Sequence, residues 1–155
     1  PNQLFALSLS HPIVDNAEIA EQILSTVENK LLNKYGLKTL SSDEDGYVDV
    51  YEGSAYKRDS SYHQGITWPW LLGLYYALKN TMIIEKNRTK RQELEEKITK
   101  LVYTTKETFK AEMFERSSIG TISEIYDSTD PYEERGAFAQ AWSVAEIFRI
   151  VLNKR

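Results

Sequence analysis

The chain has 155 residues, the length of one domain, and 41% of them are hydrophobic and 27% charged. This composition excludes a disordered chain and allows a packed core. The formal net charge is −4, cysteine is absent and two histidines are present. Nucleic-acid binders carry an excess of basic charge, whereas this sequence has a net negative charge. The cysteine and histidine counts exclude disulfides, thiolate metal sites and metal sites with three or more histidines. The longest apolar run, residues 70–78, is too short to span a bilayer.

The start of the chain has no pattern of a signal peptide, and the lack of cysteine fits a reducing compartment. We therefore predict a cytoplasmic protein that contacts neither membranes nor nucleic acids. The first residue is Pro1 rather than methionine, and we expect the chain to be a piece of a longer protein. Residues 4–10 alternate apolar and polar side chains, which predicts a short strand or an extended loop.

A first helix is predicted over residues 16–35. Asp15 would be its N-cap, with Glu18 completing a capping box, and Gly36 would end it in the left-handed conformation. One face carries apolar residues at helical spacing, namely Ala20, Ile23, Leu24, Val27, Leu31 and Leu32.

A second helix is predicted to begin at Pro69, which suits a first helical position; its apolar stripe is Leu71, Leu74, Tyr75 and Leu78. A third helix is predicted over residues 90–114, with Thr89 and Gln92 as its capping box. The sequence 87–89 matches a glycosylation sequon, which we interpret as this helix cap. A narrow apolar seam among charged residues indicates an outer helix with one face in water.

A fourth helix is predicted over residues 137–152, where nearly every residue is apolar. Such a helix should be buried on most sides. One solvated and one enclosed helix suggest two concentric helical layers, and the sequence predicts no convincing sheet. The segments 38–67 and 115–136 are long loops, and loops of this length in a compact domain are usually functional.

Residues 58–70 place a histidine and several large aromatic residues around a helix start. Aromatic faces combined with hydrogen-bonding groups suit a sugar, whose C–H faces stack while its hydroxyls bind polar groups. The alternative is structural, because aromatic side chains bury large areas wherever they pack. The residues concerned are Tyr62, His63, Trp68 and Trp70.

Residues 120–127 carry two acids in a long loop, Glu124 and Asp127. Glycoside hydrolysis requires a pair of carboxyl groups, separated by roughly 6.5–9.5 Å in inverting enzymes. Either acid could be one of the pair, and the alternative is a solvated acidic loop or an Asx turn at Asp127. The acidic stretches 41–49 and 127–134 are interpreted as solvated surface rather than metal sites, so we expect no metal or cofactor.

Three stretches together resemble a known family. Residues 1–6 are similar to its Pro-Asn-Gln segment, residues 59–71 to its Tyr-His-x-Gly-x-x-Trp-Pro-Trp motif, and residues 120–127 to the start of its terminal block. Residues 135–136 and 139–146 resemble the remainder. The chain is thus similar to the C-terminal region of archaeal and bacterial glycogen debranching enzymes, the amylo-α-1,6-glucosidase domain.

This resemblance implies an all-α fold, with residues 1–155 forming the C-terminal half of a toroid of six inner and six outer helices. It implies inverting hydrolysis of α-1,6-linked branch stubs in an α-glucan, with Glu124 as general base and a general acid upstream of Pro1. His63 and Trp68 would wall the glucose subsite. Further substrate-binding candidates are Tyr62, Trp70, Asp127 and Gln140; Asp127 either orders the loop or binds a hydroxyl, and Trp142 either faces the pocket or packs in the core.

One stretch departs from the family pattern, because residues 128–134 are more acidic than expected there.

Two other functions stay open: another toroid glycosidase of the glucoamylase or trehalase type, and a non-catalytic glycan-binding module. A half toroid would expose apolar faces. It should therefore associate with itself or with the missing N-terminal half. The isolated chain should be inactive or nearly so, because the general acid of the acid–base pair is absent.

Overall fold

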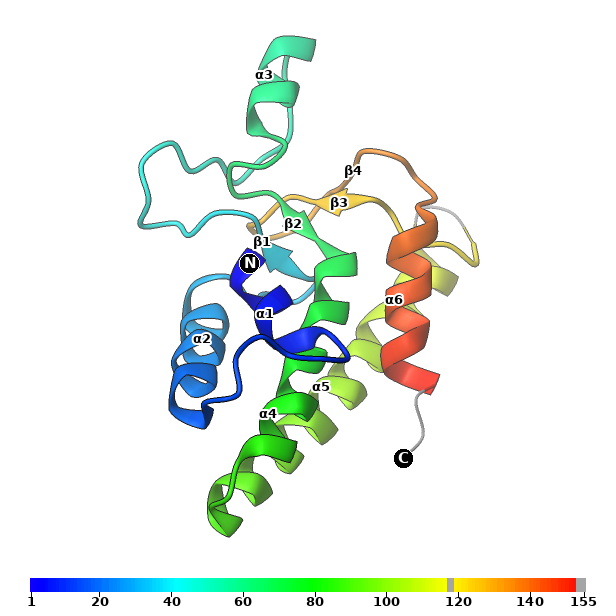
Figure 1. The fold of residues 1–155 in the computed structure, drawn as a ribbon. Helices are drawn as coiled ribbons and strands as arrows, with labels where there is room; N and C mark the ends of the chain where they lie inside the picture. The colour runs from blue at the N-terminus through cyan, green and yellow to red at the C-terminus, as the bar shows by residue number, and fades with distance from the viewer. Residues whose placement is uncertain (117–118, 153–155) are drawn as a thin grey trace.

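The computed structural model describes residues 1–116 and 119–152, with the side chains at positions 74–76 left undescribed. Within this part of the chain, helices dominate and a small sheet lies at one end of them (Figure 1). The helices are η1 (Asn2–Leu4), α1 (Phe5–Ser8), α2 (Ala17–Lys30), α3 (Ala55–Ser61), η2 (Pro69–Tyr76), α4 (Ala77–Ile84), α5 (Arg88–Glu115) and α6 (Ala141–Leu152). The strands are β1 (Leu37–Lys38), β2 (Thr67–Trp68), β3 (Ile125–Tyr126) and β4 (Glu134–Arg135).

The prediction that there is no sheet is wrong. The four strands pair antiparallel in the order β1-β2-β3-β4. Each strand is two residues long, so none shows the alternation by which a strand is recognised in a sequence. This sheet matters for function because it joins segments far apart in the chain: Thr67 pairs with Tyr126, and Ile125 with Arg135.

The start of the chain is helical, so the predicted strand or extended loop over residues 4–10 is also wrong. Leu4 and Leu7, three residues apart on one helical face, are fully buried in the core. Phe5 lies on the other side and is 39% exposed.

Helix α2 is capped by Asn16 rather than by Asp15. The side chain of Asn16 accepts hydrogen bonds from the amides of Glu18 and Ile19, at 2.9 and 3.1 Å, and so satisfies two donors that the first helical turn leaves free. The helix ends at Lys30 instead of Tyr35, because the Asn33 side chain accepts from the amides of residues 35 and 36 and forms a turn.

Gly36 does not end the helix in the left-handed conformation, contrary to the prediction. It lies where β1 approaches β2, and a Cβ atom at this position would be 2.4 Å from the carbonyl oxygen of Trp68. Glycine is therefore required here by the close contact of two backbones.

The second predicted helix is divided into η2 and α4. Leu71 and Leu78 are buried as expected, and Leu74 and Tyr75 lie outside the described side chains. Helix α5 begins two residues earlier than predicted, because Asn87 caps it by accepting from the Lys90 amide at 3.2 Å. Its narrow buried seam confirms that one side of this helix packs in the core while the rest lies in water.

Helix α6 begins at Ala141, not at residue 137, and it is not buried on most sides. It packs against η2 and α5, and its buried residues are Ser143, Ile147 and Ile150. Other apolar side chains on or beside it are exposed, namely Phe138, Trp142, Phe148 and Leu152. The apolar composition predicted burial on most sides, but the described part of the chain supplies neighbours for only one side of the helix.

The β3–β4 hairpin is fixed to the end of α5 by one buried and one half-buried polar contact. The Tyr126 hydroxyl donates to the Glu112 carboxylate at 2.6 Å, and Arg116 pairs with Glu134 at 3.0 Å. The Tyr126 ring stacks on Tyr35, with ring centres 4.5 Å apart. These contacts give the loop that carries Glu124 a rigid base.

Candidate active site

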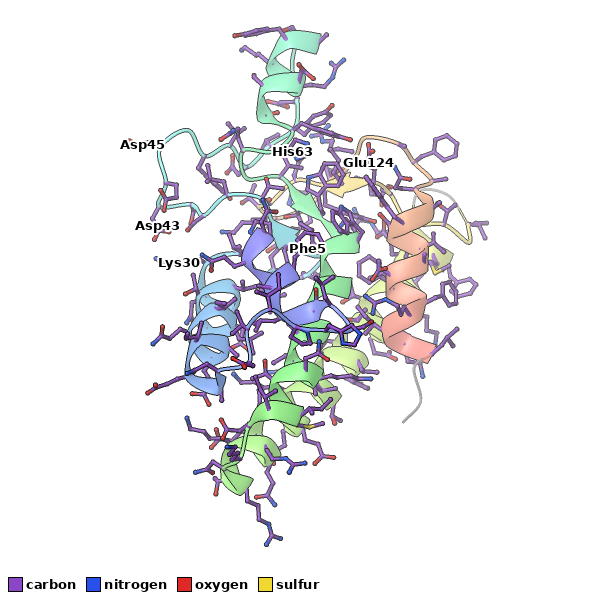
Figure 2. The ribbon with its side chains drawn as sticks, viewed as in Figure 1. Phe5, Lys30, Asp43, Asp45, His63 and Glu124 are labelled. Atoms are coloured by element: carbon purple, nitrogen blue, oxygen red, sulfur yellow. The ribbon has the colours of Figure 1, made fainter. Side chains whose placement is uncertain are left out.

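A cavity of about 350 Å³ opens at the sheet end of the molecule. Figure 2 shows His63 and Glu124 in this region, reached from different parts of the chain. The cavity brings together six of the seven predicted site residues. The full lining is Pro1, Asn2, Thr39, Tyr62, His63, Trp68, Trp70, Leu71, Glu124, Gln140 and Trp142.

Glu124 is held in a narrow loop that doubles back on itself before β3. Its amide donates to the Ala137 carbonyl at 2.9 Å, and the Gln140 amide donates to the Ile122 carbonyl at 3.0 Å. These two backbone bonds place the segment before β3 beside the segment that leads into α6. The Glu124 side chain is consequently directed toward the start of α6.

Both oxygens of the Glu124 carboxylate have a donor from this second segment. Oε2 accepts from the Ala137 amide at 3.1 Å, and Oε1 accepts from Nε2 of Gln140 at 3.0 Å. A carboxylate oxygen can accept more than one hydrogen bond, so each retains capacity for a water molecule or a hydroxyl. The carboxylate is thus oriented without being saturated.

The Tyr62 phenol adds a further donor on the other side of the cavity. Burial raises its pKa, and hydrogen bonding to Glu124 and the negative charge of that carboxylate raise it further. Because its pKa lies above the ordinary value of 10.0, Tyr62 stays protonated at neutral pH and available as a donor.

Aromatic rings form the wall opposite the loop. His63 stacks on Trp68 with ring centres 5.2 Å apart and an angle of 13°, while Tyr62 meets Trp68 edge to face at 4.7 Å. Trp68 is only 3% exposed and belongs to the hydrophobic core. The structural and site interpretations of this residue therefore both apply, since one ring packs in the core and lines the cavity.

Asp127 does not line the cavity. Its buried carboxylate accepts from the Tyr51 amide at 2.8 Å and from the Arg135 guanidinium at 2.8 and 3.0 Å. Hydrogen bonding to Asp127 raises the pKa of Arg135. Of the two roles expected for Asp127, these contacts are those of a residue that orders the loop.

Within the described residues, no group of three or more His, Asp or Glu side chains that could hold a metal ion comes together. Lys30 and Asp43 form an ion pair that joins the stretch 41–49 to the end of α2, at the edge of the molecule in Figure 2.

Sequence reasoning missed Asn2 and Thr39 as lining residues. Asn2 lies in the Pro-Asn-Gln segment of the resemblance but was given no role, and Thr39 lies in no distinctive pattern. For Trp142, the sequence left open whether it faces the pocket or packs in the core, and the structure places it in the cavity lining. Its position two residues after Gln140 was the available signal. Gly136 lies next to the Glu124 carboxylate. It belongs to a segment that resembles the family, but no role was predicted for it.

Comparison with known families identifies the chain's relatives. The model of a family described as amylo-alpha-1,6-glucosidase matches residues 1–149. The chain belongs to the amylo-α-1,6-glucosidase family. The match includes every segment on which the resemblance was based, from Pro1 to the turns of α6, and identifies a domain of the glycogen debranching type. No helix in the described part of this family member is long and apolar enough to cross a bilayer.

Proposed function

We propose that this chain supplies the general base and the glucose-binding wall of a cytoplasmic α-1,6-glucosidase that acts on branch stubs of a glycogen-like α-glucan. One observation carries the proposal: a doubly hydrogen-bonded carboxylate, Glu124, faces stacked aromatic rings in a cavity of about 350 Å³. Family membership supplies the substrate class. A neutral sugar suits the cavity, since no lysine or arginine is among its lining residues.

In the proposed reaction, the Glu124 carboxylate removes a proton from a water molecule as that water attacks the anomeric carbon. A new C–O bond forms on one face of the sugar while the glycosidic C–O bond breaks on the other. The leaving oxygen takes a proton from a general acid, so the products are glucose of inverted configuration and a shortened glucan. Gln140 and the Ala137 amide would keep the carboxylate aimed at the water.

The general acid is proposed to come from outside this chain. An inverting glycosidase uses two carboxyl groups on opposite sides of the bond, and among the described lining residues only Glu124 carries one. The apolar side chains exposed on α6 support a further proposal, that this chain is completed by other helices in a toroid. Trp68, His63 and Tyr62 would then close the glucose subsite from one side.

A substrate comparison with the full-length protein tests this function. We expect free glucose from a phosphorylase limit dextrin, with the β-anomer formed first when products are followed by NMR. A preference for linear maltose-type ends or for trehalose would instead indicate a glucoamylase-like or trehalase-like enzyme. Glucan binding without any glucose release, from folded protein, would indicate a non-catalytic glycan-binding module.

A further inference from the structure

Trp142 is an exposed residue of α6 that does not contribute to the buried face of that helix. It lies in the first turn of α6, whose contacts to the core come from Ser143, Ile147 and Ile150. The indole is 46% exposed, yet it lines the cavity that contains Glu124. An exposed tryptophan in a concave site is a feature of ligand-binding surfaces rather than of helix packing.

Two other aromatic rings follow Trp142: Trp70, which also lines the cavity, and Phe5, which is not among the lining residues. Trp142 stacks on Trp70, with ring centres 5.4 Å apart and an angle of 26°, and Trp70 contacts Phe5 at 6.4 Å. Phe5 on α1 is 39% exposed. We call Trp142, Trp70 and Phe5 the aromatic strip. It joins the cavity wall at Trp68, which meets Trp142 edge to face at 6.0 Å.

The cavity alone is too small for a polymeric ligand. Its volume of about 350 Å³ lies near the lower end of the range for small-molecule sites, about 300–1,000 Å³. A glucan longer than a few residues must therefore extend past the cavity opening. The aromatic strip offers flat apolar faces at such an exit, and Asn2 and Gln140 supply polar groups on the same lining.

We propose that the aromatic strip binds glucose residues of the α-glucan chain beyond the residue held at Glu124, and that Trp142 sets the preference for longer chains. This inference rests on the proposed function for the identity of the ligand. The sugar C–H faces would stack on Trp142 and then on Trp70, while Phe5 would contact the most distant residue. A neutral polymer fits rings that lie next to a lining without lysine or arginine.

Calorimetric titration of the full-length protein with maltoheptaose and with glucose tests the proposal. Trp142→Ala should weaken maltoheptaose binding about three- to tenfold, the effect of losing one stacking contact. Glucose binding should weaken by a smaller factor, because glucose occupies only the subsite at Glu124. Trp142→Phe should restore most of the affinity, since it keeps a stacking ring.

Phe148→Ala is the matched control, because Phe148 is a similarly exposed aromatic residue of α6, 42% exposed, outside the cavity lining. It should leave both affinities unchanged. Equal maltoheptaose affinity in wild type and Trp142→Ala, with both folded by circular dichroism, would overturn the proposal. If the wild type hydrolysed no glucan, but Trp142→Ala still weakened maltoheptaose binding, the aromatic strip would stand and only the proposed catalysis would be overturned.

Discussion

Replacing Gly136 by alanine should reduce glucose release from limit dextrin by about a hundredfold, the effect of a displacement near 1 Å in a catalytic group. A Cβ atom at position 136 would lie 2.3 Å from Oε2 of Glu124 and 3.0 Å from Cγ1 of Ile125. The carboxylate must therefore leave the position in which Ala137 and Gln140 hold it. Steady-state kinetics of the full-length protein measure the loss.

Gly120→Ala is the control for this variant. Gly136 and Gly120 both have positive φ, at 69° and 81°, so alanine costs about 1 kcal/mol of backbone strain at either position. A Cβ atom at position 120, however, would meet no atom of the described, non-adjacent residues within 4 Å. We expect Gly120→Ala to lower stability without the loss of activity. Equal activities of the two variants would show that Glu124 does not need its observed position.

Replacing Asp127 by alanine should lower the free energy of unfolding by about 2–3 kcal/mol. Breaking a fully buried ion pair costs about 3–5 kcal/mol, and the expected value is smaller because the Arg135 side chain is 31% exposed. The variant would also leave the Tyr51 amide without its acceptor. Urea unfolding followed by fluorescence measures the change.

Two variants bracket this result. Asp127→Asn keeps an acceptor for Tyr51 and should lose less than Asp127→Ala. Lys97→Ala removes a surface ion pair with Glu28, whose side chains are 49% and 23% exposed, and should cost less than about 1 kcal/mol. If Asp127→Ala were no more destabilising than Lys97→Ala, Asp127 would not be what orders the loop before Gly136.

The sequence predicted the site better than the arrangement of the chain around it. Glu124, His63 and Trp68 were located by motif, and the structure places them in one cavity. Asp127 was grouped with Glu124 because both are acids in one loop. The two acids flank the two-residue strand β3, however, and the Asp127 carboxylate binds Arg135 and Tyr51 instead of lining the cavity.

Other features depend on contacts that no local pattern records. The requirement for glycine at position 36 comes from the Trp68 carbonyl, more than thirty residues away. The end of α2 at Lys30 depends on the Asn33 turn, although the apolar face continues to Leu32. The composition of α6 predicts burial, but the neighbours that would bury Phe148 and Leu152 are not among the described residues of this chain.

The most direct test of the central claim is α-1,6-glucosidase activity of the full-length protein on a phosphorylase limit dextrin, with and without Glu124→Gln. Glutamine keeps the shape of the side chain but cannot take a proton from water. We predict a loss of about a thousandfold, within the range that general acid–base groups contribute. Glu133→Gln, an exposed acid of the same hairpin, should keep full activity. Activity of Glu124→Gln within about tenfold of wild type would contradict the assignment of Glu124 as the catalytic base.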